Sequence, residues 1–119
     1  MENYSALQSF IDSQIKYQQR KLDGMLSNLN NDFSYYLSWN AEESYKLHLG
    51  IKEMRDWKKA LENESEEKFL ESTIKSYKRF LDSQNNVVGY STNQVSNLCT
   101  AWKYQAVMEL KSQLESFNK

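Results

Sequence analysis

Residues that could bind a metal or carry out catalysis are few in this chain of 119 residues. His48 is the single histidine and Cys99 the single cysteine, and the two lie in different predicted helices. A zinc site generally needs at least three protein ligands. The Glu-x-x-His pair of di-iron helical bundles is absent too, because Ser44 and Tyr45 occupy the positions four and three residues before His48. The sequence therefore predicts no metal and no cofactor.

Motifs that activate a serine or hold a phosphate are also missing. The chain contains no Gly-x-Ser-x-Gly elbow, no Gly-x-x-x-x-Gly-Lys-Ser/Thr loop and no Gly-x-Gly-x-x-Gly loop. Acidic clusters at 42–43 and 64–67 stand at predicted helix starts, where carboxylates interact favourably with the helix dipole. We therefore predict that the protein is not an enzyme. A ligand-binding or catalytic bundle with a cavity around His48, Tyr45 and Trp102 stays open as an alternative.

Composition narrows the fold class and the partners. With no proline and only three glycines the chain has few helix breakers, which favours long helices. A net charge of −1 removes the general attraction to nucleic acid. No apolar run approaches the roughly 18 residues of a membrane-spanning helix, and the N-terminus lacks a basic segment followed by an apolar one. We expect a cytoplasmic protein, with neither membrane nor nucleic acid as its partner.

Two further features of composition concern Cys99 and the source of the chain. Cys99 cannot form an intramolecular disulfide by itself, and its helical neighbours Leu98 and Trp102 predict a buried, small apolar side chain.

Abundant Asn and Lys, with only three Arg, are typical of an AT-rich coding sequence, as in low-GC bacteria and their phages.

Apolar residues recur at three- and four-residue steps over the first half of the chain, which predicts amphipathic helices. The first helix runs from about Tyr4 to Leu29, and a polar loop follows at 28–32. Gly24 lies inside this helix at a cost of about 1 kcal/mol relative to Ala, and marks a place for a kink or a close helix contact. Residues 32–62 fit either one long helix or a short helix at 32–38 followed by a main helix at 41–62. We favour the second interpretation, because Asn40 and the acids after it resemble a helix start.

Helix starts are also visible in the second half. Asn63, followed by several acids, predicts a helix that ends near 83–86. Ser91 and Gln94 have the spacing of a capping box, which predicts a last helix from about Thr92 to Phe117. Amphipathic helices joined by short polar loops most simply form an antiparallel bundle. We predict an all-α fold with four long helices, one short extra helix at 32–38, and a single domain over 1–119.

The start of the last helix resembles part of a DNA-binding motif. Gly89-Tyr90-Ser91, followed by Val95 and Leu98, is similar to the turn and the recognition-helix start of bacterial helix-turn-helix repressors. The similarity spans about ten residues and departs from the pattern upstream, where Gln84 and Asn85 replace an apolar and a small residue. The alternative function that the resemblance implies is a DNA-binding regulator with a degenerate helix-turn-helix at 82–103. Its candidate base-reading and phosphate-binding residues are Thr92, Asn93, Ser96, Asn97 and Lys103.

Surplus aromatic residues give the stronger indication of binding. Aromatic side chains crowd the segment before Asn40, and aromatics spread around a helix cannot all face one core. Tyr and Trp are also enriched at the energetic centres of protein interfaces. We therefore expect a non-enzymatic accessory, adaptor, immunity or inhibitor protein that binds another protein or a second copy of itself. The candidate contact residues are Tyr35, Tyr36, Trp39 and Trp57. Packing of these aromatics at the edge of the core is the competing interpretation.

Overall fold

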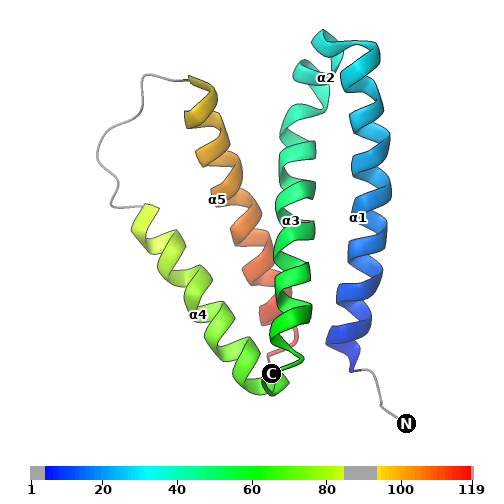
Figure 1. The fold of residues 1–119 in the computed structure, drawn as a ribbon. Coiled ribbons are helices and arrows are strands. Elements are labelled where there is room, and N and C mark those ends of the chain that lie inside the picture. Colours follow the sequence, from blue (N-terminus) through cyan, green and yellow to red (C-terminus); the bar gives the residue numbers. More distant parts are fainter. Residues whose placement is uncertain (1–4, 85–93, 119) are drawn as a thin grey trace. The chain divides into compact units, whose positions relative to one another are not determined.

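The computed structural model describes residues 5–84 and 94–118, which form five helices and no strand (Figure 1). The helices are α1 (Ala6–Asn31), α2 (Phe33–Trp39), α3 (Ala41–Ala60), α4 (Glu66–Gln84) and α5 (Gln94–Glu115). The predicted all-α class is confirmed over these residues. The chain divides into two compact units, Met1–Lys59 (unit 1) and Ala60–Lys119 (unit 2). The single domain over 1–119 stays a prediction.

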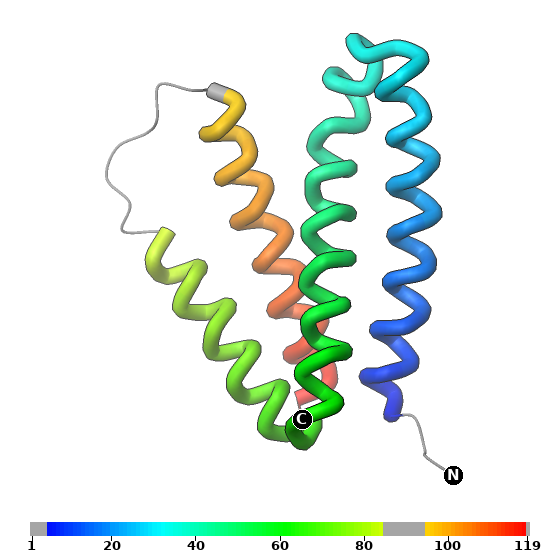
Figure 2. Tube along the Cα trace, in the orientation of Figure 1, coloured from blue at the N-terminus to red at the C-terminus, as the bar shows by residue number. Residues whose placement is uncertain are grey.

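Unit 1 is built on an antiparallel pair of helices, α1 and α3, whose backbone traces (blue and green) run side by side in Figure 2. Contacts between the two helices fix their direction. Lys58 Nζ lies 2.9 Å from Asp12 Oδ1, Gln18 Nε2 donates to Met54 Sδ at 3.9 Å, and Asn28 Nδ2 donates to Asn40 Oδ1 at 2.8 Å. Because later residues of α1 contact earlier residues of the α3 segment, the helices are antiparallel, as the sequence predicted.

The start of α1 is a capping box that the sequence analysis missed. Ser5 Oγ accepts from the Gln8 backbone N–H at 3.1 Å, and the Gln8 side chain accepts from the Ser5 backbone N–H at 3.2 Å. The two bonds satisfy backbone N–H groups that the first turn of a helix otherwise leaves without partners. The helix therefore begins at Ala6 rather than at Tyr4.

The connection from α1 to α3 contains the short helix predicted at 32–38, here Phe33–Trp39. The predicted loop at 28–32 is reduced to Asp32, whose backbone N–H donates to Asn28 O and whose side chain accepts from the Tyr35 backbone N–H. Asp32 thus ends one helix and starts the next. Asn40 then separates α2 from α3, so a single helix across this region is wrong and the two-helix interpretation is confirmed.

The apolar core of unit 1 follows the predicted stripes. Leu22, Leu47 and Ile51 form one buried cluster, with Met25 packed against it. Gly50 is buried beside the Gln18 side chain, whereas a Cβ atom at Gly24 would meet nothing within 4 Å. The close helix contact therefore occurs at Gly50, and the sequence-based suggestion of such a contact at Gly24 is wrong.

Unit 2 contains α4 and α5, which contact each other. Ser65 Oγ accepts from the Lys68 backbone N–H at 3.2 Å, so Ser65 caps α4 and the helix begins later than the predicted Asn63 start. Asn63 instead belongs to the preceding turn, where its backbone N–H donates to Ala60 O at 3.0 Å. The buried apolar side chains of this unit are Phe69, Leu70, Tyr77, Ala106, Val107, Leu110 and Leu114.

The apolar stripe predicted for the last helix is buried in its second half only. Val95 and Leu98 are exposed, Cys99 is half-buried instead of buried, and the core positions begin at Ala106. The predicted capping motif at 89–95 lies largely outside the described residues, which resume at Gln94. No helix among the described residues combines the length and the apolar character that crossing a membrane requires.

Candidate functional site

The seven-residue helix α2 buries none of its residues. Its apolar and aromatic side chains are largely exposed to solvent: Phe33 by 59%, Tyr35 by 49%, Leu37 by 54% and Trp39 by 73%. The sequence FSYYLSW also contains no charged residue. An uncharged helix with this much apolar exposure is unusual on a protein surface, where exposed apolar patches tend to be small and functional.

The spacing of these side chains explains their exposure. Apolar residues stand at every second position of α2, and two residues turn an α-helix by about 200°. Phe33 and Leu37 therefore share one side of the helix, while Tyr35 and Trp39 share another. One neighbouring helix could cover only one of the two sides. The pattern that makes α2 a poor core helix gives it two apolar pairs for contact with another molecule.

The structure divides the predicted partner-binding residues into two groups. Tyr35 and Trp39 are exposed and Tyr36 is half-buried, and all three lie on α2. Trp57 lies near the end of α3 with only 2% of its surface exposed, so its side chain is not part of the exposed aromatic set. Phe33 and Leu37, which the sequence analysis did not select, belong to that set instead. The alternating apolar pattern from 33 to 39 was the signal that would have identified them.

The residues of the DNA-binding alternative are only partly described. Thr92 and Asn93 lie outside the described residues, whereas Ser96 and Lys103 are exposed on α5 and Asn97 is half-buried. Lys103 Nζ lies 5.0 Å from the centre of the Phe80 ring, which is a cation–π contact between α5 and α4. The first helix of a helix-turn-helix at 82–103 would begin at residue 82. Residues 82–84 belong to the end of α4, and residues 85–88 are outside the described residues.

The residues of the ligand-binding alternative lie in separate units. His48 is exposed and Tyr45 half-buried on α3 in unit 1, and Trp102 is half-buried on α5 in unit 2. Among residues 5–84 and 94–118, no three His, Cys, Asp or Glu side chains are grouped as a metal site would require. His48 therefore lies on the surface of unit 1, in a different unit from Trp102.

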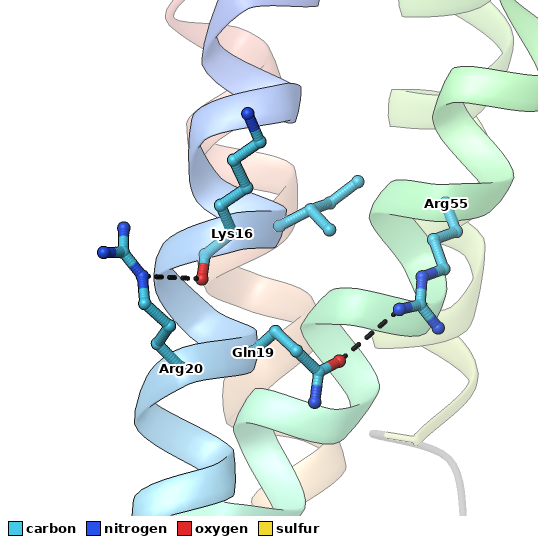
Figure 3. Close-up of a pocket in the computed structure, with 5 residues that line it drawn as sticks. Lys16, Gln19, Arg20 and Arg55 are labelled. Carbon is cyan, nitrogen blue, oxygen red and sulfur yellow. Dashed lines mark hydrogen bonds between the residues drawn. The ribbon is translucent and has the colours of Figure 1, made fainter.

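A second surface feature of unit 1 is an open hollow of about 460 Å³ on α1 and α3 (Figure 3). The lining residues are Ile15, Lys16, Gln19, Arg20 and Arg55. Arg20 Nε donates to the Lys16 backbone oxygen at 3.5 Å, and Arg55 Nη2 donates to Gln19 Oε1 at 3.4 Å. The sequence analysis missed this group because Arg55 is distant in the chain from the other four residues.

Comparison with protein-family models, curated proteins and solved structures finds no match to this chain. The chemistry of the exposed residues is therefore the basis for a functional proposal.

Proposed function

We propose that this chain is a non-enzymatic protein that binds another protein through α2. The observation that carries the proposal is that all four apolar and aromatic residues at alternate positions of α2 are exposed, with Trp39 exposed by 73%. Trp and Tyr contribute large contact areas at a low cost in side-chain entropy and are frequent at the energetic centres of interfaces. Tyr35 and Trp39 are the expected anchors, with Phe33 and Leu37 on the other side of the helix.

The size of this surface fits the centre of an interface. Tyr35 and Trp39, which share one side of α2, together expose on the order of 300 Å². A standard interface buries about 800 Å² on each partner. Contacts beyond α2 must therefore contribute, and Leu26, which is exposed near the end of α1, is one apolar residue available for them.

The absence of charge on α2 indicates the kind of partner. A nucleic acid or an anionic membrane surface is normally contacted through Lys and Arg, and α2 contains neither. An apolar groove on a partner protein can accept a short helix through anchor residues spaced four apart. Tyr35 with Trp39, or Phe33 with Leu37, has this spacing. The proposed partner is therefore a protein with an apolar groove.

Site-specific photo-crosslinking tests the proposal. A photoreactive phenylalanine analogue is placed at Tyr35 or, as a matched control, at Tyr17, which is exposed by 54% on α1 of the same unit. We expect crosslinking to one partner protein from position 35 and not from position 17. The partner is then purified, and its affinity is measured for the unmodified chain and for the variants Trp39→Ala and Tyr17→Ala.

A hot-spot residue typically contributes 2 kcal/mol or more, so Trp39→Ala should weaken binding by at least about 30-fold and Tyr17→Ala by less than about 2-fold. Equal affinities for the two variants would contradict the proposal. Crosslinking of position 35 to a second copy of this chain would show that α2 mediates self-association and does not bind another protein.

A further inference from the structure

The hollow on α1 and α3 gathers three cationic side chains and no carboxylate. Lys16, Arg20 and Arg55 contribute the positive charges, and Gln19 and Ile15 complete the lining. Figure 3 shows Lys16, Gln19 and Arg20 on one helix and Arg55 on the facing helix, with the Arg55 guanidinium directed at Gln19. Residues from two helices therefore line one open hollow.

Lys16, Arg20 and Arg55 differ in their pairing from three other basic residues of unit 1. Lys21, Lys46 and Lys58 each form a salt bridge, with Glu43, Glu42 and Asp12 respectively. Lys16, Arg20 and Arg55 form no ion pair with any residue in the described part of the chain. None of the three charges in the hollow is thus paired in a salt bridge with a described residue.

The local hydrogen bonds hold the two guanidinium groups while using few of their donors. Arg20 donates through Nε to the Lys16 backbone oxygen, and Arg55 donates through Nη2 to Gln19 Oε1. An arginine side chain has five N–H donors in all. Gln19 is held in turn, since its Nε2 donates to Asp23 Oδ1 at 2.9 Å. Most guanidinium donors stay available for a ligand.

We propose that this hollow binds an anion containing a diphosphate group. Guanidinium groups offer paired donors that match phosphate oxygens, and the lysine ammonium adds a point charge. Three cations on two helices suit an anion with several negative charges better than a single carboxylate. The volume of about 460 Å³ falls within the range of small-ligand sites and leaves space beside Ile15 for a less polar part of an ester.

The binding test uses the full chain with inorganic diphosphate, orthophosphate and a nucleoside diphosphate as probes. Binding of each probe is measured by calorimetry at an ionic strength of about 0.02 M. We expect a Kd for diphosphate below about 1 mM, several-fold weaker binding of orthophosphate, and weakening of both as salt is added. Tighter binding of the nucleoside diphosphate than of inorganic diphosphate would assign the site to an ester, and the reverse order to the free anion. No saturable binding of either diphosphate would overturn the proposal.

The chain contains three arginines, and the third, Arg79, is exposed on α4 in unit 2. Arg79 therefore serves as an internal control for binding at Arg20 and Arg55. In nitrogen-15 NMR spectra, diphosphate should shift the Nε–H signals of Arg20 and Arg55 and leave that of Arg79 in place. Arg55→Gln and Arg20→Gln should each weaken binding by about tenfold, and Arg79→Gln by less than twofold. Circular dichroism checks that each variant is folded. Equal shifts of all three signals, or equal affinities for the three variants, would show general charge attraction and overturn the site.

Discussion

Gln18 occupies the space that a side chain at Gly50 would need. Its Oε1 lies 2.6 Å from the position of a Cβ atom built on Gly50, closer than real Cβ contacts occur. The same amide is held on its other side, where Nε2 donates to Gln14 Oε1 at 3.2 Å and to Met54 Sδ at 3.9 Å. The contact between α1 and α3 at this level is thus an amide packed against a glycine backbone.

Gly50→Ala should leave the free energy of unfolding nearly unchanged in the natural sequence. Alanine favours a helix over glycine by about 1 kcal/mol. Its Cβ would displace the Gln18 amide, and the lost hydrogen bonds cost about as much. In a Gln18→Ala background the obstacle is gone, so the same substitution should stabilise by about 1 kcal/mol. Urea unfolding followed by circular dichroism measures both effects, and equal effects in the two backgrounds would contradict the packing described.

Gly24→Ala should raise the free energy of unfolding by about 0.5–1 kcal/mol. Gly24 lies inside α1, and a Cβ atom there would meet nothing within 4 Å. The helix-propensity gain is therefore not offset by a clash. The same urea experiment tests this prediction, and Gly50→Ala is its matched control. A loss of stability on this substitution would show that Gly24 has a packing role.

Substitution of Trp39 should change the free energy of unfolding far less than substitution of Trp57, because the first is exposed by 73% and the second by 2%. Trp39→Ala should change the free energy of unfolding by less than about 0.5 kcal/mol. Trp57→Ala should lower it by about 3–5 kcal/mol, since a large buried side chain is removed. Trp39→Phe should also remove the tryptophan emission most easily quenched by acrylamide. Strong destabilisation by Trp39→Ala would mean that the Trp39 side chain packs against the protein after all.

The Lys21–Glu43 pair should stabilise the fold at neutral pH and lose its effect in alkali. The hydrogen bond and the charge attraction from Glu43 raise the pKa of Lys21 above its ordinary value. A group whose pKa is higher in the folded state stabilises fully below its unfolded pKa and less as pH rises through the folded value. Both side chains are substantially exposed, so the contribution is about 0.5 kcal/mol.

A double-mutant cycle of Lys21→Met and Glu43→Gln measures the coupling energy between the two side chains. The coupling energy should be near its full value at about pH 8 and close to zero at about pH 12, well above the ordinary lysine pKa. Effects of alkali elsewhere in the protein are common to the four proteins of the cycle and cancel. A coupling that persists at the higher pH would assign it to packing rather than charge.

The amino-acid sequence by itself determined the helical class and the separation of α2 from α3. These features depend on local signals, since apolar periodicity, capping side chains and breakers act within one or two turns of a helix. The errors in the positions of helix starts were small. The capping box at Ser5 was missed, and α4 is capped by Ser65 instead of Asn63. They arose because several neighbouring residues can serve as caps.

Tertiary structure alone decided which of the singled-out residues are accessible. Trp39 and Trp57 were both candidate contact residues, yet one is exposed and the other buried, because burial depends on what packs against each helix. The same reason places the close contact at Gly50 rather than Gly24. It also brings Arg55 beside Gln19 from the facing helix, a pairing of residues 36 positions apart that no local pattern predicts.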